Sequence, residues 1–152
     1  MNANTRITRE CTFNELNPVL ITAIRAHTAE YKLGNLEPDI LMCCETTTTR
    51  EKKGLFGKSI STDITGIFIT PLWLVWSGSK EGTGSAQLKQ IDVHDFANSA
   101  MFEISPDFGL NITGRYTNHS QTGQVFIGLD SGPVGQKFRD MLHAALKKLT
   151  VN

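Results

Sequence analysis

The stretch with the clearest chemical potential is a run of basic residues, residues 50–58, that contains two glycines. Its single acidic residue is Glu51, so its local charge is +3, and its four positive residues are Arg50, Lys52, Lys53 and Lys58. Flexible lysines beside glycines can surround a phosphate, and each contributes about 1 kcal/mol near an anionic surface. Leu55 and Phe56 lie between the lysines, where they can enter a membrane interface. The stretch therefore predicts a loop that binds an anion or a lipid headgroup.

A second interpretation of the same residues assigns them no ligand. In it, residues 50–58 form a solvated hairpin tip, the lysines discourage edge-to-edge strand pairing, and Phe56 folds back onto the domain. The sequence leaves both interpretations open.

The only clustering of a histidine with carboxylates is Asp92-Val93-His94-Asp95. In an extended strand Asp92 and His94 share a face, which suits a metal site or a general-base pair. Either chemistry needs a third ligand or a nucleophile, and the sequence nominates none. The four histidines also lack zinc-like spacing. We therefore expect no catalytic residue, no metal and no cofactor.

A glycine-lysine-serine triplet, residues 57–59, is similar to the end of a phosphate-binding P-loop. It fails on spacing, because the residue five positions before Gly57 is Lys52 rather than glycine. It also precedes an expected strand, whereas a P-loop opens a helix.

The three cysteines are Cys11, Cys43 and Cys44. Their number is odd, and an extended strand points Cys43 and Cys44 to opposite faces, so a disulfide between these neighbours would be strained. No C-x-x-C spacing is present for redox or zinc chemistry. We expect buried or half-buried structural thiols.

The composition is that of one globular domain. With 152 residues, 39% of them hydrophobic, the chain can bury a substantial core. Basic and acidic residues number 15 each, and this zero net charge gives no support for a nucleic-acid binder. The N-terminus lacks the apolar core of a signal peptide, and the longest apolar stretch, residues 67–76, is far short of the roughly 20 residues that span a bilayer. We expect a cytoplasmic protein.

The elements that must position these residues begin with one helix. Asn17 followed by Pro18 is typical of a helix start, apolar residues recur at helical spacing, and Gly34 ends the run. The pattern predicts a helix over residues 18–33, with His27 as a partly buried structural side chain. Residues 1–37 then form an N-terminal segment packed on a domain of residues 38–152, within one structural domain overall.

Residues 38–129 carry apolar and β-branched patterns that predict six or seven short, mostly antiparallel strands. We expect strands near residues 40–49, 60–70, 72–77, 88–93, 101–104, 108–115 and 125–129. Turns are expected at 78–85 and 118–123, and an irregular stretch at 95–99. Asp130 or Ser131 can cap a last helix, with Pro133 in its first turn and an apolar stripe that continues to Leu149.

Three segments carry a resemblance to a known family: KKGLFG (52–57), ITGIFITPLWLVWS (64–77) and FIGLDSGPVGQKFRDMLHAAL (126–146). Together they resemble the pleckstrin-homology (PH) superfold, particularly its small bacterial and GRAM-like relatives, over about residues 38–149. The resemblance implies a PH-like barrel of six or seven antiparallel strands capped by the C-terminal amphipathic helix. It also implies that residues 50–58 are the loop that usually holds phosphoinositide head groups. The chain differs from the family in its extra N-terminal helix and in residues 59–63, which lack further basic side chains.

Two tryptophans are candidates for an interface. Trp73 and Trp76 are three positions apart, so an extended strand points them to opposite faces. We expect one of them in the core, and the other, like Phe56, at an interface with a partner.

These observations predict a non-catalytic binding or assembly module of PH-like fold. Its expected partner is another protein, a second copy of the chain or, weakly, an anionic membrane surface, and not a nucleic acid. The alternative is a helix-grip barrel that encloses a small apolar ligand, because that fold also places helical structure early and a long helix last.

Overall fold

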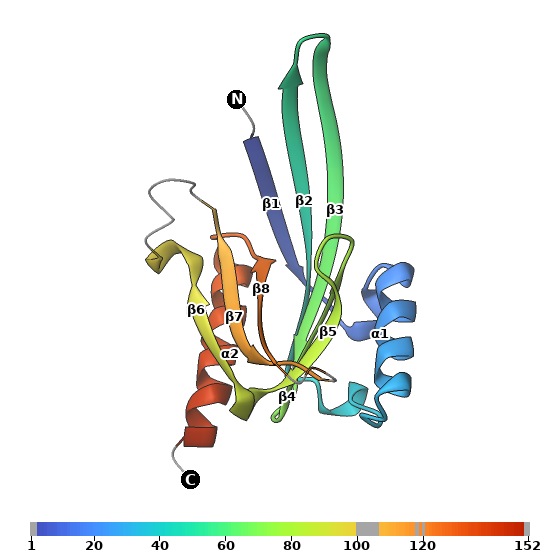
Figure 1. Ribbon diagram of the computed structural model, residues 1–152, viewed down its shortest axis with the longest axis vertical. Helices are drawn as coiled ribbons and strands as arrows, with labels where there is room; N and C mark the ends of the chain where they lie inside the picture. Colours follow the sequence, from blue (N-terminus) through green and yellow to red (C-terminus); the bar gives the residue numbers. More distant parts are fainter. Residues whose placement is uncertain (1–2, 100–106, 118, 120, 151–152) are drawn as a thin grey trace.

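The computed structural model describes residues 3–99, 107–117, 119 and 121–150 of the chain. It is a mostly-β α+β fold with two antiparallel sheets, an N-terminal helix and a C-terminal helix (Figure 1). The first sheet contains β1 (Ala3–Glu10), β2 (Met42–Gly54), β3 (Gly57–Ile69), β4 (Trp73–Gly78) and β5 (Gly82–Gln87), paired in that order. The second contains β6 (Ile91–Asp95), β7 (Gly109–Arg115) and β8 (Thr122–Gly128). The helices are α1 (Pro18–Glu30) and α2 (Pro133–Thr150).

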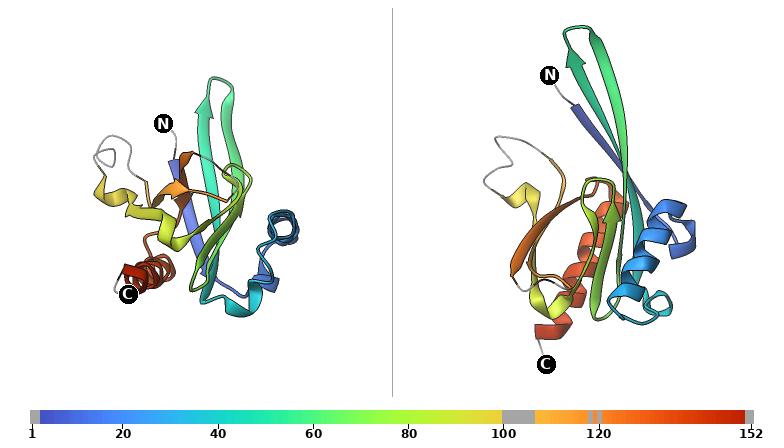
Figure 2. Two further views of the ribbon diagram at one scale, coloured as in Figure 1. Left: turned by 60° about the horizontal axis from the view of Figure 1, so that its bottom comes forward. Right: turned by 45° about the vertical axis from the view of Figure 1, so that its right-hand side comes forward.

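The five-stranded sheet is covered on both faces near its base. Its inner face meets the second sheet and α2 in the larger core cluster, where Trp76, Ile112 and Phe138 are buried together. Its outer face is covered by α1 through a smaller cluster that includes Ile24 and Phe68. Figure 2 shows the two helices on opposite sides of this sheet. Burial on both faces explains why β3 ends in a continuous run of buried residues rather than an alternating one.

Both predicted helices are present. Asn17 caps α1, its side chain accepting a hydrogen bond from Val19 N at 3.0 Å, and α1 ends at Glu30, three residues before the predicted end. In α2, Phe138, Leu142 and Ala145 are buried at spacings of four and three, as the apolar stripe predicts. Neither helix has the length and hydropathy that crossing a membrane requires, in the part of the chain that the structure describes.

One strand was not predicted from the sequence. Residues 1–15 show no apolar period, yet residues 3–10 form β1, which pairs antiparallel with β2 from Ala3 opposite Glu51 to Glu10 opposite Cys44. The prediction failed because the inward-facing side chains of β1, Arg6 and Thr8, are polar. The described residues therefore hold eight strands rather than six or seven, and the segment of residues 1–37 contributes a strand as well as a helix.

Two predicted loops are strands. The basic stretch of residues 50–58 is mostly ladder, because β2 and β3 pair up to Gly54 opposite Gly57 and leave only Leu55 and Phe56 as a turn. Gly57 has φ +125°, a conformation that favours glycine at this position. Residues 82–85, predicted as a turn, belong to β5. A Cβ on Gly84 would lie 2.5 Å from the Trp76 ring, so glycine is required here by close packing.

The remaining strand predictions agree with the structure to within a few residues where it describes them. Residues 88–90 are the exception, since they form a short 3-10 helix before β6. The irregular stretch at 95–99 contains another, Phe96–Asn98. The strand predicted at residues 101–104 lies outside the described residues.

The two sheets do not form a closed barrel, because no strand ladder joins them among the described residues. The edges of the two sheets are joined instead by hydrogen bonds between isolated pairs of residues. At one edge, Thr117 N donates to Ser85 O of β5 at 2.8 Å. At the other, Thr8 of β1 is bound to Asp130, just after β8.

The contact between Thr8 and Asp130 connects three elements. Thr8 N donates to Asp130 Oδ2 at 2.8 Å, and Asp130 N donates back to Thr8 Oγ1 at 3.0 Å. The other carboxylate oxygen of Asp130 accepts from Gly132 N at 3.0 Å ahead of α2, and Arg139 Nη1 donates to Asp130 O at 2.9 Å. Asp130 therefore fixes β1, the end of β8 and the start of α2 relative to one another.

Replacing Asp130 by alanine removes the acceptor of two backbone N–H groups, one of them on the buried residue Thr8. We expect the free energy of unfolding to fall by about 2–3 kcal/mol. Urea denaturation followed by circular dichroism measures this change. Asp140→Ala, at an exposed position on α2, is the control and should stay within about 0.5 kcal/mol of the unmodified chain. Equal stabilities of the two variants would contradict the role of Asp130.

His27 gives the fold a pH dependence of known sign. Its side chain is buried as predicted, Nε2 lies 2.8 Å from Ser85 Oγ, and burial lowers the pKa of the imidazole. In the unfolded chain His27 binds a proton as the pH falls below about 6.5, whereas in the folded chain it stays neutral to a lower pH. The free energy of unfolding therefore decreases as the pH falls below about 6.5. In urea denaturation at pH 7.5 and 5.5, we expect His27→Gln to lose less stability on acidification than the unmodified chain. An equal loss in both would refute this source of pH dependence.

Candidate functional site

The outer end of the β2–β3 hairpin, residues 50–63, projects from the body of the protein and is called the arm here (Figure 1). Every residue from 52 to 62 is exposed. The six residues 57–62 of β3 correspond to about 20 Å of extended chain. The arm therefore presents its turn well away from the core.

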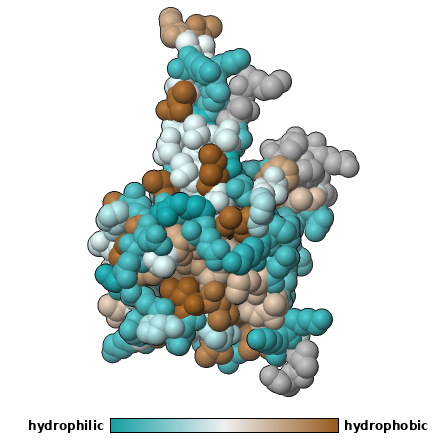
Figure 3. Space-filling view, turned by 180° about the vertical axis from the view of Figure 1, so that it is seen from behind, coloured by the Kyte–Doolittle hydropathy of each residue, from teal (hydrophilic) through white to brown (hydrophobic). Residues whose placement is uncertain are grey.

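The turn at the end of the arm is apolar. Leu55 is 94% exposed and Phe56 is 99% exposed, and Figure 3 shows hydrophobic atoms at the end of the projection. Residues 50–58 are therefore a solvated hairpin tip, as the second interpretation predicts, but Phe56 does not fold back onto the domain as that interpretation expects. Ile60, 65% exposed, adds a third apolar side chain to the arm. The described part of the chain therefore leaves Leu55 and Phe56 almost completely exposed to solvent and Ile60 mostly so.

Lysines surround the apolar turn. Lys53 and Lys58 lie directly opposite each other across the hairpin, and Lys52 lies opposite Ser59 on the other face. Lys58 forms an ion pair with Glu51, whereas the described residues offer Lys52 and Lys53 no ion pair. The three lysines are within three residues of Leu55 or Phe56, so positive charge and apolar surface occur together at the tip.

The fourth predicted basic residue, Arg50, is at the base of the arm and has a different environment. Its Nε donates to Asp63 Oδ2 at 2.9 Å, and this hydrogen bond lowers the pKa of the Asp63 carboxyl. Arg50 thus links β2 to β3, and the four basic residues do not converge on one phosphate-sized site. Counting Glu51 and Asp63 against them, residues 50–63 carry a net charge of +2.

The two tryptophans point to opposite faces, as predicted, but neither is on the arm. Trp76 is 2% exposed and its ring meets Tyr116 edge-on in the larger core, so it offers no surface to a partner. Trp73 is half-buried against the cluster beneath α1. Of the three residues predicted at an interface, Phe56 alone is fully presented to solvent.

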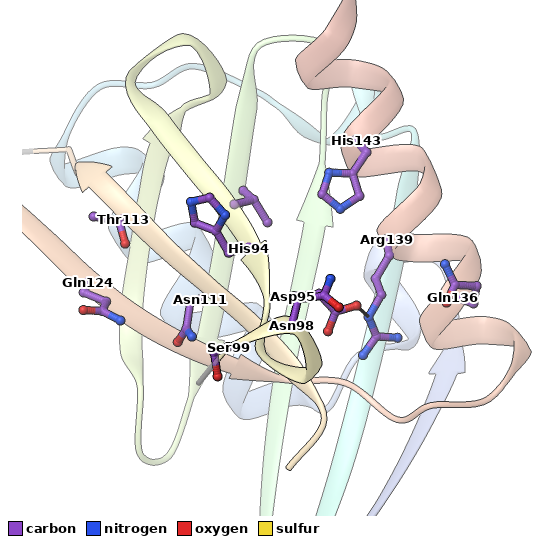
Figure 4. A pocket seen from close by; sticks show the side chains of 11 residues that line it. His94, Asp95, Asn98, Ser99, Asn111, Thr113, Gln124, Gln136, Arg139 and His143 are labelled. Atoms are coloured by element: carbon purple, nitrogen blue, oxygen red, sulfur yellow. Dashed lines mark ion pairs between the residues drawn. The ribbon is translucent and has the colours of Figure 1, made fainter. Parts of the chain in front are cut away.

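A second candidate site is a polar pocket of about 550 Å³ beside the edge strand β6 (Figure 4). Its side chains come from β6, β7, β8, α2 and the short helix after β6, and include His94, Asp95, Asn111, Arg139 and His143. Arg139 Nε lies 3.1 Å from Asp95 Oδ2 as an ion pair. Among the described residues, Ser99 Oγ is buried without a hydrogen-bond partner, and Arg139 Nε is buried with this ion pair as its contact but without a hydrogen bond of good geometry. The pocket can hold a polar molecule.

The pocket does not assemble the chemistry considered for Asp92 and His94. These two residues lie on β6, which is extended as expected, and both are exposed, but Asp92 does not line this pocket. No group of three or more histidine, cysteine, aspartate or glutamate side chains that would hold a metal occurs among residues 3–99, 107–117, 119 and 121–150. The described residues that line the pocket provide hydrogen-bonding groups of both signs of charge, chiefly Arg139 and Asp95.

Comparison with family models, curated proteins and solved structures finds no match to this chain. The candidate sites must therefore be judged on their own geometry. Sequence reasoning located the arm through its lysines and its Gly-Leu-Phe-Gly turn. It missed the polar pocket, because those side chains come from five separate elements and no single stretch of sequence contains them.

Because Leu55 and Phe56 touch so little of the body, they should contribute nothing measurable to stability. We expect the double variant Leu55→Ser/Phe56→Ser to keep its free energy of unfolding within about 0.5 kcal/mol of the unmodified chain. Phe68→Ala, in the buried part of β3, should lose about 3–5 kcal/mol. Urea denaturation measures both, and a large loss in the double variant would mean that the tip packs on the body.

Proposed function

We propose that this protein is a non-catalytic binding module of PH-like arrangement that docks weakly on anionic membrane surfaces through the tip of the arm. The observation that carries the proposal is the exposure of Leu55 and Phe56 at the end of a paired hairpin, with three lysines around them. Such a tip presents an apolar wedge and positive charge to the same surface.

The order of elements supports the PH-like part of the proposal. Without β1 and α1, the chain runs through seven antiparallel strands, β2 to β8, and ends in the amphipathic helix α2. This order is the one that the resemblance implies. The arm is then the first inter-strand connection, the position at which the resemblance implies contact with lipid head groups.

Elementary energetics support weak and reversible docking. Transferring a Leu or Phe side chain from water to an apolar environment contributes about 1.5–3 kcal/mol when burial is complete. Each lysine near an anionic surface adds about 1 kcal/mol, and salt screens this part. Two apolar side chains and a few lysines therefore favour association that depends on anionic lipid and on ionic strength.

The ion pairs on the arm indicate which of its basic residues are free to contact lipid phosphates. Arg50 and Lys58 already have carboxylate partners in Asp63 and Glu51, so they supply less free charge than the sequence suggests. Lys52 and Lys53 are the residues best placed to meet lipid phosphates. This spread of charge favours recognition of a negative surface over recognition of one specific headgroup.

A protein partner is the second candidate, and one observation favours it. On the side away from β2, residues 57–64 of β3 have no strand partner among the described residues, since β4 pairs only from Thr65 onward. An exposed strand edge of this kind can accept a strand from another chain. A partner that binds here would not require anionic lipid.

The helix-grip alternative finds less support. The space between the sheets is filled by the larger core cluster, whose members include Phe138, Leu110 and Ile127, each 0% exposed. A binder of apolar ligands needs an enclosed cavity there instead. The polar pocket described above lies beside β6, outside this core.

Co-sedimentation with vesicles tests the proposed function. Neutral phosphatidylcholine vesicles are compared with vesicles that contain phosphatidylserine, at 20 mM and 150 mM sodium chloride. We expect the chain to bind only the anionic vesicles, and several-fold more at low salt. Leu55→Ser/Phe56→Ser should reduce binding at both salt concentrations, and Lys52→Ser/Lys53→Ser chiefly at low salt, because only the electrostatic part is screened.

The matched control is Lys89→Ser/Lys147→Ser, which removes the same charge from exposed positions away from the arm. It should bind nearly as well as the unmodified chain. If it loses as much binding as Lys52→Ser/Lys53→Ser, attraction depends on overall charge and the arm is not the contact. Absence of binding to anionic vesicles at low salt would refute membrane docking and favour a protein partner.

A further inference from the structure

Two of the three cysteines lie opposite each other across β1 and β2. Cys11 follows the last residue of β1, and its N–H donates to Cys43 O at 3.0 Å, which continues the register in which Glu10 is opposite Cys44. Residues paired in this way have Cα atoms about 5.5 Å apart. Disulfides have Cα atoms about 4.4–6.8 Å apart, so the separation typical of such a pair lies within the range of a bond between these thiols.

The side chains of this pair share one environment, and the third cysteine does not. Cys11 and Cys43 both belong to the cluster beneath α1, on the outer face of the five-stranded sheet. Cys44 points to the inner face and is 0% exposed in the larger core. All three are free cysteines, so the pair is present as thiols.

The two paired thiols differ in exposure and in proton affinity. Cys11 is half-buried, whereas Cys43 is 2% exposed. A hydrogen bond with the Cys43 thiol lowers the pKa of Cys11, burial opposes this, and the positive charge of Arg9 lowers the pKa further. The same hydrogen bond and burial raise the pKa of Cys43, and burial raises the pKa of Cys44 to about 12. Cys11 is thus the thiol that solvent reaches and that ionises first.

We propose that Cys11 and Cys43 form a peroxide-reactive pair in which Cys11 is the attacking thiol and Cys43 resolves the product into a disulfide. The Cys11 thiolate attacks one oxygen of hydrogen peroxide, an S–O bond forms, the O–O bond breaks, and the departing hydroxide takes a proton to become water. The Cys43 sulfur then attacks the sulfenic acid at Cys11, the S–S bond forms, the S–O bond breaks, and the Cys43 proton leaves with the hydroxide as water. Two thiols lose two electrons, and peroxide is reduced to two waters.

The site is independent of membrane docking. Cys43 is near the start of β2, whereas the arm begins at Arg50 and the tip follows Gly54 at the other end of the strand. The disulfide would join the residue that leaves β1 to β2 and close a loop that contains α1. Its formation can therefore be tested without reference to lipid.

The test uses the full chain, fully reduced and then freed of reductant, with a small excess of hydrogen peroxide. Alkylation of free thiols and digestion without reductant, followed by tandem mass spectrometry that fragments the chain between Cys43 and Cys44, should show Cys11 cross-linked to Cys43 while Cys44 is alkylated. Thiol titration in denaturant should fall from three groups per chain to one. Cys44→Ala is the matched control and should form the same disulfide.

The order of attack has its own readout. In Cys43→Ala the sulfenic acid has no resolving thiol, so dimedone should label Cys11. In the unmodified chain, iodoacetamide should alkylate Cys11 at least ten-fold faster than Cys43 or Cys44. The proposal is overturned if peroxide leaves the folded, unmodified chain without a Cys11–Cys43 disulfide, or if dimedone labels Cys44 in preference to Cys11. Because the peptide map uses the unmodified chain, it decides the matter even where a variant fails to fold.

Discussion

The position of β1 depends on polar contacts that close the core at the base of the arm. Thr8 and Asp130 exchange two hydrogen bonds, and Thr8 Oγ1 lies 2.8 Å from Thr46 Oγ1. Two residues earlier on the same face of β1, the Arg6 guanidinium donates two hydrogen bonds to the Asp107 carboxylate, at 2.9 and 2.8 Å. It donates a third to Thr48 Oγ1 at 2.7 Å. Buried polar groups are costly unless they are paired, so these contacts admit one register of β1 against β2.

The same contacts mark the point at which the core ends and the arm begins. On the inner face of β2, buried Cys44 gives way to Thr46 and Thr48, and then to Arg50 and Lys52. Beyond Thr48 the described residues place no apolar layer on this face of the sheet, and the hairpin is held by its own ladder, by pairing with β1 as far as Glu51 and by the Arg50–Asp63 ion pair. A hairpin stabilised in this way has no structural need for leucine and phenylalanine at its turn. The proposed docking supplies a reason for their exposure that the fold does not.

The sequence predicted those elements whose apolar period is strong. The two helices and the alternating strand β7 were found because one face of each is apolar and meets the core. β1 was missed because its inward side chains are polar and acquire their partners from distant parts of the chain. Thr46 and Thr48 lie on β2, and Asp107 and Asp130 are more than 100 positions away. β5 was missed because its glycines are typical of a turn. The reason for Gly84, the close packing of the Trp76 ring against it, is a contact between strands that the sequence does not show.

For the arm, too, some features can be read from the sequence and others depend on how the strands pair. Lysines and an apolar pair in a short stretch can be read directly from the sequence, and they indicated the turn at Leu55 and Phe56, although most of residues 50–58 is strand rather than loop. The partners that neutralise two of the four basic residues follow from strand pairing, since Asp63 and Glu51 meet Arg50 and Lys58 only when β2 and β3 are aligned. The polar pocket combines β6, β7, β8 and α2, so no local pattern could indicate it.

The two proposed sites use opposite ends of one strand, and the pairing of that strand separates them. β2 is registered against β3 along its whole length, from Met42 opposite Ile69 to Gly54 opposite Gly57, and against β1 over most of it. A disulfide between Cys11 and Cys43 adds a covalent bond where a backbone hydrogen bond already joins these residues. The disulfide therefore does not shift β2, and the paired strand between Cys43 and the tip contains no flexible segment that could transmit a movement. Oxidation should change the stability of the segment that contains α1 and leave the presentation of Leu55 and Phe56 unaltered.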